Sequence, residues 1–339
     1  MGATTELDGG ERRSGWQPRE LIQTPPVFVW PPRPLGFLKW LFGSDGYLWP
    51  WNALFAALAL LAWRFATPPL PMMKHAAIGW IALIFARNLV LITLYASAWH
   101  WRLYAQRAQG IAYKYNSRWP TPENSTFLLG SQLRDNLFWT LFSAVPIWTT
   151  YEVLTFWLQA NGYVPTVSWE LHPAYCTLLM LSIPLLRDIH FYAVHRLIHW
   201  PPLYRTVHYL HHKNVNPGPW SGMAMHPVEH ILYFSGVVLH WIIPSHPLHV
   251  LFHLYHLALS PAVGHSGFHR VLLNRTGGVS LTTGSYRHYL HHKYFEVNYG
   301  GDGICPIDKW CGTFHDGSEE AQQKMKQRLN ARRDSRASV

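Results

Sequence analysis

Histidines dominate the C-terminal half of this 339-residue chain, and their spacing is regular. Nineteen of the 22 histidines lie between His190 and His315. They form an H-x4-H cluster from position 190, an H-x2-H-H cluster from position 208, an H-x3-H cluster from position 265 and a second H-x2-H-H cluster from position 288. The histidines of one H-x2-H-H cluster fall within about 100° on a helix, so their imidazoles are expected to converge on one point. Imidazole is the commonest metal ligand among side chains.

The number of clustered histidines indicates two metal ions, because a single zinc site uses only three or four protein ligands. The predicted ligands are His190, His195, His208, His211, His212, His265, His269, His288, His291 and His292. His190 and His195 lie about 140° apart on an ideal helix, so they are expected to reach different metals or to need a local bulge. Isolated histidines such as His75 and His240 are interpreted as core or interfacial residues.

Composition indicates a membrane protein, because 49% of the residues are hydrophobic and only 14% are charged, well below the usual quarter. The chain has 18 Trp and 17 Tyr, whose rings gather at membrane interfaces. A bilayer span needs about 20 apolar residues. The stretches 76–99, 137–158 and 174–194 are long enough, and 49–65 is marginal. We therefore expect an all-α polytopic membrane protein with about four transmembrane helices and a cytoplasmic, histidine-rich helical cap. A fifth apolar region, 231–259, contains histidines and prolines and is predicted to form an interfacial or re-entrant helical hairpin.

Charge placement orients the predicted spans. Lys and Arg recur in the N-terminal segment and in the loop 100–136, whereas the segment 161–172 has none. The positive-inside tendency therefore predicts cytoplasmic positions for the N-terminus, for that loop and for everything after the fourth span. The first 25 residues contain no apolar core of a signal peptide. The predicted organisation is 1–45 as a cytoplasmic segment, 46–136 as two transmembrane helices with a basic loop, 137–316 as the catalytic domain and 317–339 as a basic, disordered tail. That tail accounts for much of the net charge of +10, so no nucleic-acid partner is expected.

Acidic residues near the histidine clusters are few, which distinguishes this pattern from soluble di-iron bundles with Glu and Glu-x-x-His ligands. We expect the carboxylates to accept the distal N–H of ligating imidazoles. The candidates for such supporting roles are Asp188, Glu229, Glu296, Asp302 and Asp308, together with His199 and His226. A zinc hydrolase needs only three protein ligands, so most of these histidines would be idle. Redox iron that handles O2 makes better use of them.

Several motifs resemble the sterol desaturase and fatty acid hydroxylase superfamily. They read DIHFYAVHRLIH at 188–199, HYLHH at 208–212, MHPVE at 225–229, GHSGFH at 264–269, HYLHHK at 288–293, NYG at 298–300 and DKWCGTF at 308–314. The last run lacks the Trp of the family's terminal element, with Ile307 in its place. The resemblance covers about 137–316 and implies a membrane-embedded helical fold. It also implies that the ten predicted ligands hold two non-haem irons.

The resemblance further implies a membrane monooxygenase or desaturase that uses O2 to attack an unactivated C–H bond of a lipid. The lipid could be a sterol, a fatty acyl chain, a sphingolipid or an isoprenoid. With no haem-binding domain fused here, electrons are expected from a separate cytochrome b-type protein or from a ferredoxin and its reductase. The predicted location is the endoplasmic reticulum of a eukaryote or the inner membrane of a bacterium, with the histidines on the cytoplasmic face.

Hydroxylation is the first expectation because it requires only one C–H bond to be positioned. Desaturation is the alternative, because the NYG element and the H-x2-H-H spacing look similar to sterol C-5 desaturases. From other classes, a zinc hydrolase and a non-catalytic metal-binding membrane protein remain open.

Overall fold

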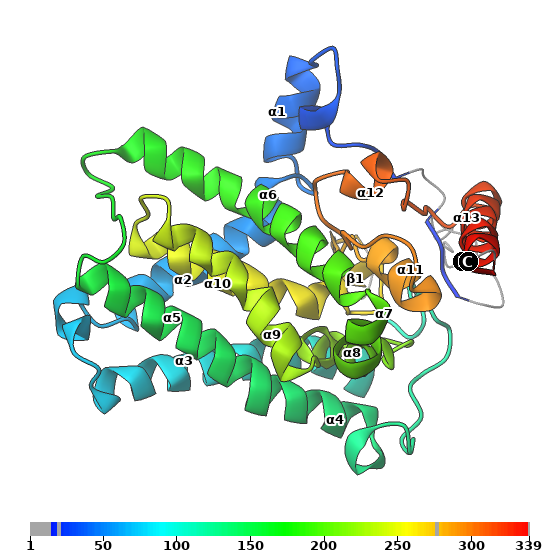
Figure 1. Ribbon diagram of the computed structural model, residues 1–339, viewed down its shortest axis with the longest axis horizontal. Coiled ribbons are helices and arrows are strands. Elements are labelled where there is room, and N and C mark those ends of the chain that lie inside the picture. Colours follow the sequence, from blue (N-terminus) through cyan, green and yellow to red (C-terminus); the bar gives the residue numbers. More distant parts are fainter. Residues whose placement is uncertain (1–14, 19–21, 275–277, 338–339) are drawn as a thin grey trace.

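The structure, a computed structural model, describes residues 15–18, 22–274 and 278–337 (Figure 1). The described chain is mainly helical, as predicted, with two short strands. The α-helices are α1 (Pro34–Phe42), α2 (Ala53–Phe65), α3 (Ile78–His100), α4 (Gln132–Trp139), α5 (Val145–Ala160), α6 (Pro173–Ile198), α7 (Pro201–Leu203), α8 (Tyr209–His212), α9 (Pro227–Phe234), α10 (Pro247–Gly264), α11 (Tyr286–Tyr294), α12 (Ile307–Trp310) and α13 (Glu319–Ala337). The strands β1 (Arg270–Leu272) and β2 (Ser280–Thr282) pair antiparallel.

Two helices of the described chain are long and apolar enough to cross a bilayer. One is α3 with its π-helical extension η4 (Trp101–Ala105), together 28 residues, and the other is α6 with 26 residues. At 1.5 Å per residue they measure about 42 and 39 Å, more than the 30 Å hydrocarbon core. The stretches 49–65 and 137–158 form the shorter helices α2 and α5. Four transmembrane crossings therefore stay a prediction.

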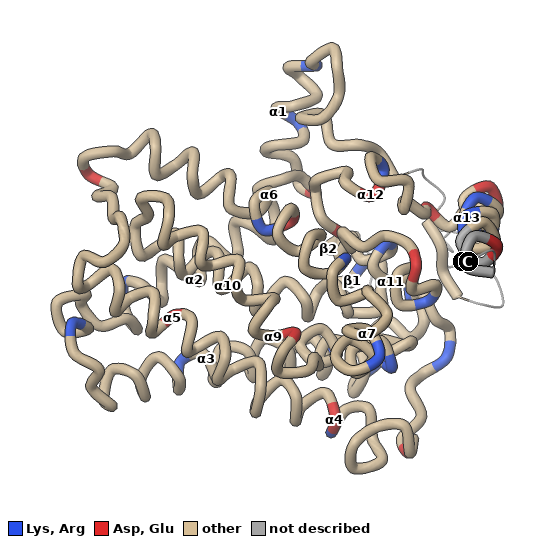
Figure 2. The backbone as a smooth tube through the Cα atoms, in the orientation of Figure 1, with Lys and Arg blue, Asp and Glu red and all other residues tan. Residues whose placement is uncertain are grey.

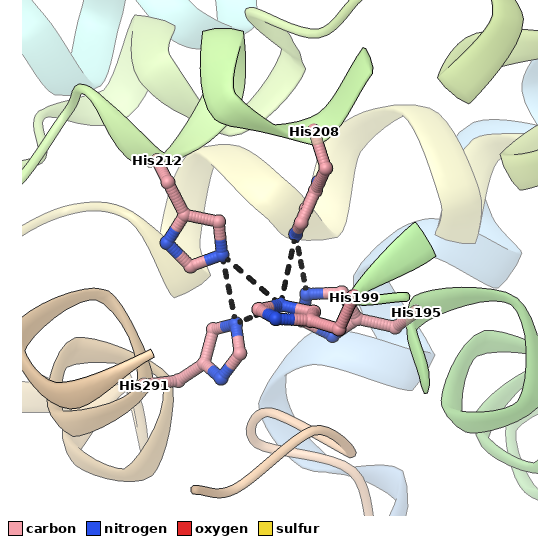
Figure 3. A group of neighbouring side chains, drawn as sticks. All are labelled: His195, His199, His208, His212 and His291. Atoms are coloured by element: carbon pink, nitrogen blue, oxygen red, sulfur yellow. Dashed lines mark hydrogen bonds between the residues drawn. The ribbon is translucent and has the colours of Figure 1, made fainter. Parts of the chain in front are cut away.

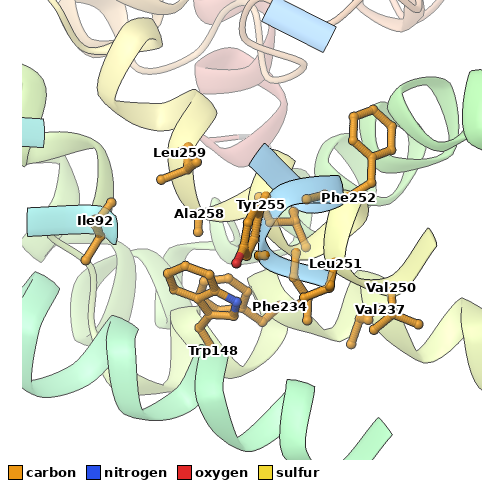
Figure 4. Close-up of a cluster of buried hydrophobic side chains, with 14 of the residues drawn as sticks. Ile92, Trp148, Phe234, Val237, Val250, Leu251, Phe252, Tyr255, Ala258 and Leu259 are labelled. Atoms are coloured by element: carbon orange, nitrogen blue, oxygen red, sulfur yellow. The ribbon is translucent and has the colours of Figure 1, made fainter. Parts of the chain in front are cut away.

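Helix α10 lies at the centre of the bundle, which differs from the interfacial hairpin predicted for 231–259. Fifteen of its 18 residues are buried, and it packs against α2, α3, α5 and α6. Figure 4 shows its side chains Leu251 and Tyr255 among Trp148 of α5 and Phe234 of α9. The histidines of this region do not need the interface, because His240, His249 and other imidazoles find hydrogen-bond partners inside the bundle.

Segments from distant parts of the sequence gather at one end of the bundle. The N-H of Trp16 donates to the Lys114 carbonyl (2.9 Å), and the N-H of Tyr115 donates to the Gly267 carbonyl (3.0 Å). The N-terminal segment, the basic loop and the chain after α10 are thus in contact beside α11. Figure 2 shows Lys and Arg frequent at this end and sparse along the bundle.

The C-terminal tail predicted to be disordered contains the 19-residue helix α13. Arg328 anchors this helix by donating to the backbone carbonyls of Gly312 (2.6 Å) and Glu296. Lys324 pairs with Glu320 one turn away at 2.6 Å. The high charge of the tail is therefore compatible with a helix that is docked through Arg328.

Candidate metal centre

Four structural elements bring histidines together at the charged end of the bundle. The last turns of α6 carry His195 and His199, and His265 directly follows α10. The two H-x2-H-H clusters lie on η7 (Tyr204–His208) with α8, and on α11. Nine imidazoles thus come from segments between 195 and 292, and they form two groups.

The first group has five imidazoles with converging Nε2 atoms (Figure 3). Its members are His195, His199, His208, His212 and His291. The Nε2 of His208 lies 3.1 Å from that of His195 and 3.1 Å from that of His199. The other neighbouring Nε2 pairs of the group are separated by 3.1 to 3.2 Å.

The second group has four buried imidazoles. Its members are His211, His265, His288 and His292, and their ligand atoms all lie within 4.8 Å of one another. The Nε2 of His265 is 3.0 Å from the Nε2 of His288 and 3.0 Å from that of His292. His211 contributes a ring whose centroid lies 5.0 Å from that of His265.

Each H-x2-H-H cluster is divided between the two groups, which corrects the expectation that its three imidazoles converge on one point. His208 and His212 face the first group, whereas His211 faces the second. In α11 the i, i+4 pair His288 and His292 belongs to the second group, and His291 to the first. The side chains of adjacent helical residues point about 100° apart. Two neighbouring histidines can therefore belong to two different groups.

Hydrogen bonds at the distal ring nitrogens orient the imidazoles. In the first group the Nδ1 of His195 donates to the Tyr299 carbonyl (2.6 Å), and the Nδ1 of His291 donates to the Val297 carbonyl (2.6 Å). His208 Nδ1 lies 2.8 Å from Glu229 Oε1. These acceptors fix the hydrogen on Nδ1 and leave the Nε2 lone pair directed into the group.

The second group has similar distal contacts. The Nδ1 of His265 donates to the Pro261 carbonyl (3.1 Å), and the Nδ1 of His211 donates to the Ala224 carbonyl (3.3 Å). Both acceptors are backbone carbonyls: Pro261 belongs to α10, and Ala224 directly follows a buried 3-10 helix. These rings therefore also present unprotonated Nε2 atoms.

Burial keeps these imidazoles neutral. It lowers the pKa of His211 to about 4 and that of His291 to about 3, because the charged ring is desolvated. It also places the pKa of His212 and that of His292 well below the usual range. Neutral imidazole is the form that binds a metal, so the rings are ready as ligands at neutral pH.

The nitrogen spacing fits two metal ions. Lone pairs only about 3 Å apart repel one another unless a cation lies between them. Two nitrogens held about 2.1 Å from one metal at a right angle lie about 3.0 Å apart, close to the observed 3.0 to 3.2 Å. All-imidazole donors suit Zn, Cu, Fe and Ni, so iron is compatible with the donor set.

The structure brings together eight of the ten predicted ligands and leaves out His190 and His269. The Nε2 of His190 lies 2.9 Å from Ser235 Oγ, on a different face of α6 from His195. His269 stacks on Trp16 with ring centroids 4.3 Å apart, and its Nδ1 lies 3.2 Å from the Tyr115 hydroxyl. His190 lies outside the groups because it is separated from His195 by about 140° around a continuous helix.

His199 joins the first group although the sequence indicated only a supporting role. It lies four residues after His195 on α6, so the two rings share one face. This i, i+4 spacing was available in the sequence. His226 instead caps α9, where its Nδ1 accepts a hydrogen bond from Val228 N (3.2 Å).

Two of the acidic candidates hold the loop after α11 against the first group. Asp308 accepts hydrogen bonds from the N-H of Tyr299 (2.9 Å) and of Gly300 (2.7 Å). Asp188 accepts from the N-H of Ile304 and of Cys305. Because the Tyr299 carbonyl binds His195, Asp308 acts on that histidine through the backbone.

Glu296 and Asp302 have other contacts. Glu296 Oε2 accepts from the Tyr299 hydroxyl at 3.1 Å. Asp302 Oδ1 accepts from the N-H of His288 at 3.2 Å, next to the second group. Burial raises the pKa of Asp302 to about 7.

A largely apolar cavity of about 250 Å³ lies beside both groups. His195 and His208 of the first group line it, as do His211, His265 and His288 of the second. The apolar wall includes Phe55, Phe191, Met225 and Val263. An apolar molecule in this cavity would lie directly against both sets of imidazoles.

The N-terminal segment also contributes to the cavity, a role that no motif indicated. Trp40 of α1 and Tyr47 in the following turn line it. Figure 1 shows α1 standing apart from the bundle above α6 and α12. Leu35 and Phe42 of α1 are exposed, as expected of a helix that contacts lipid.

Comparison with known proteins finds relatives of the part of the chain that carries both histidine groups. Residues 180–313 match the family model described as fatty acid hydroxylase. The chain is 30% identical over 170 residues to a Delta(7)-sterol 5(6)-desaturase of Candida glabrata, covering 47% of this chain and 43% of that relative. A tobacco Delta(7)-sterol-C5(6)-desaturase is 26% identical over 265 residues, covering 76% of this chain and 89% of the relative.

A third relative, from Candida albicans, is again a Delta(7)-sterol 5(6)-desaturase, 29% identical over 47% of this chain and 41% of its own length. The chain thus spans about two fifths of the length of these two yeast relatives. No solved structure matches it significantly.

Proposed function

Because residues 180–313 belong to the sterol desaturase and fatty acid hydroxylase superfamily, we propose that this chain is a membrane-bound oxidoreductase that oxidises a C–H bond of a lipid. The observation that carries the proposal is the pair of all-histidine groups beside an apolar cavity. A hydrolase or a simple metal store has no need for nine converging imidazoles and an apolar chamber. The proposed metals are two irons, one for each group.

Two iron ions bound to these imidazoles would activate O2 and accept the electrons that the reaction consumes. The first iron would be held by His195, His199, His208, His212 and His291, and the second by His211, His265, His288 and His292. The protein contributes orientation through the carbonyl and carboxylate partners of the distal nitrogens. The cavity contributes a largely apolar space beside both groups.

Asp302 is suited to hold a proton beside the cavity. Its Oδ1 accepts the His288 N-H, so a proton on this carboxyl would lie on Oδ2. Burial raises the pKa of this carboxyl to about 7, which favours its neutral form relative to an exposed aspartate. Both reactions considered below consume two protons, and Asp302 lines the cavity as a candidate donor of one of them.

Desaturation is the better supported outcome, although hydroxylation needs fewer geometric conditions. Both consume one O2, two electrons and two protons. Desaturation removes hydrogen from two neighbouring carbons and yields an alkene and two waters, whereas hydroxylation yields an alcohol and one water. The relatives' names favour desaturation of a sterol-like lipid.

Electrons are proposed to come from a separate carrier, of the cytochrome b type or a ferredoxin with its reductase. The location proposed is an integral membrane position with the histidine groups at the cytoplasmic face. The gathering of basic residues at the end that carries both groups supports this orientation.

The test uses the purified chain in lipid nanodiscs, loaded anaerobically with Fe(II) and supplied with a reductant and a mixture of sterols and acyl lipids. Under 18O2 we expect a new double bond in a sterol and no 18O in the lipid product. An 18O-labelled alcohol would support hydroxylation instead. Lipids that all remain unchanged, with iron bound at both groups, would refute the proposed activity.

A further inference from the structure

A second set of polar side chains lies inside the bundle, separate from both histidine groups. It consists of His190 on α6, Ser235 and His240 in the 3-10 helix η9 (Ser235–Trp241), Ser245 in the next turn and His253 on α10. His240 and His253 are completely or almost completely buried. Polar residues within a membrane bundle are costly unless paired, so their contacts are informative.

The first half of this set has a defined hydrogen-bond direction. The Ser245 hydroxyl donates to the Ile243 carbonyl (3.0 Å), so its oxygen accepts from His240 Nδ1 at 2.8 Å. His240 therefore has an unprotonated Nε2, which accepts from His253 Nδ1 at 3.1 Å. In a neutral imidazole only one nitrogen carries hydrogen. The Nε2 of His253 is consequently an acceptor.

The other two members of the set, Ser235 and His190, also have a defined hydrogen-bond direction. The Ser235 hydroxyl donates to the Leu232 carbonyl (2.7 Å), so its oxygen accepts from His190 Nε2 at 2.9 Å. The Nδ1 of His190 is then also an acceptor. Among the described residues, neither His190 Nδ1 nor His253 Nε2 has a hydrogen-bond partner, and both atoms are buried.

Both acceptor nitrogens lie close to Gly236. A Cβ atom built on Gly236 would lie 3.1 Å from His190 Nδ1 and 3.3 Å from His253 Nε2. Two buried lone pairs directed at one place require a molecule that donates two hydrogen bonds, or a cation. The Arg187 guanidinium interacts electrostatically with both rings and disfavours a cation there.

We propose that one water molecule binds between His190 Nδ1 and His253 Nε2 and donates a hydrogen bond to each. Water is the smallest neutral molecule with two donors, and buried waters typically join polar groups that have no other partner. The bound water completes a continuous chain of hydrogen bonds from Ser245 to Ser235. This inference is independent of the proposed function.

The water would tie α6 to α10, two of the four elements that supply the histidine groups. His195 and His199 follow His190 on α6, and His265 follows the end of α10. A hydrogen-bonded link at His190 and His253 limits sliding of one helix along the other. His190, which lies outside both metal groups, would thus have a structural role.

Magic-angle-spinning NMR of the full-length, 15N-histidine-labelled protein in lipid nanodiscs tests the proposal. His190→Phe and His253→Phe samples provide the assignments. We expect unprotonated, hydrogen-bonded shifts for His190 Nδ1 and His253 Nε2, and a cross-peak from each to water. A hydrogen covalently bound to either nitrogen, or no water cross-peak, would overturn the proposal. A third metal ion per chain that shifts both resonances would also overturn it.

Gly236→Ala supplies a specific perturbation, because its methyl group would occupy the space between the two nitrogens. Gly79→Ala is the matched control, since no atom lies within 4 Å of a Cβ at that helical glycine. Loss of both water cross-peaks in Gly236→Ala and their retention in Gly79→Ala is the expected result. Cross-peaks of unchanged intensity in Gly236→Ala would contradict the site. Should Gly236→Ala not fold, the spectra of the unmodified protein decide alone.

Discussion

Glu229 provides a graded test of the first histidine group. Its Oε1 lies 2.8 Å from His208 Nδ1, and both side chains are buried. Glu229→Gln keeps an oxygen acceptor for His208 but removes the charge, whereas Glu229→Leu removes the acceptor as well. Loss of such an outer partner typically weakens metal binding 10- to 100-fold, which corresponds to about 1.4 to 2.7 kcal/mol. We expect Glu229→Gln to weaken metal binding by about 10-fold and Glu229→Leu by about 100-fold.

Only one of the two metals should respond. The distal partners of His211 and His265 in the second group are backbone carbonyls, which the Glu229 substitutions leave in place. Anaerobic titration with Co(II), followed by its absorption and by chelator competition, resolves the two affinities. Glu170→Gln, at an exposed site with its Oε2 bonded to Ser168, is the control. Equal weakening of both sites, or full affinity at both in Glu229→Leu, would refute the reasoning.

Three further outcomes are expected. His199→Ala should reduce bound iron from two to about one per chain while His190→Ala keeps both, as measured by elemental analysis; two irons in His199→Ala would contradict the first group. In the buried pair Arg87 and Glu152, Glu152→Leu should lower the free energy of unfolding by about 3 to 5 kcal/mol, because it leaves a buried charge unpaired. The double variant Arg87→Met/Glu152→Leu should recover most of that loss. Denaturation in detergent measures both variants, and a further loss of stability in the double variant would contradict the prediction. Burial lowers the pKa of Lys114 from 10.5 to about 8, so the unfolded chain binds more protons in this range and stability should rise from pH 8 to pH 10. Thermal denaturation should show this rise in the unmodified protein, and a rise of the same size in Lys114→Met would refute the assignment to this amine.

The sequence contained most of the metal site because helical spacing is a local property. An H-x2-H-H cluster places its rings within about 100° on a helix whatever surrounds it, and all six histidines of the two such clusters lie in the two groups. Of the four predicted from the H-x4-H and H-x3-H clusters, His195 and His265 lie there and His190 and His269 do not. The i, i+4 relation of His195 and His199 follows the same rule, so His199 could have been selected from sequence. The helical character of the chain and its apolar stretches could also be predicted from the sequence, because hydropathy is likewise a local property.

Tertiary structure decided how the histidines are shared. His211 and His212 are neighbours in sequence, yet each meets rings from α11 in a different group. That assignment depends on how α8, α11, α6 and the end of α10 pack together, and no local pattern specifies their relative rotation. His269 shows the same limit, since its i, i+4 spacing from His265 loses its meaning once α10 ends at Gly264 and the chain turns toward β1.

The position of α10 was likewise a tertiary outcome. Its histidines suggested an interfacial segment, but His256 bonds Asn52 inside the bundle, His249 bonds the Cys176 carbonyl, and His253 bonds His240, which in turn bonds Ser245. The polarity of one segment is read from sequence, whereas its burial depends on partners that lie up to 204 residues away. Spacing along a helix therefore identified the chemistry, and packing between helices determined which nitrogens, carboxylates and apolar walls form one site.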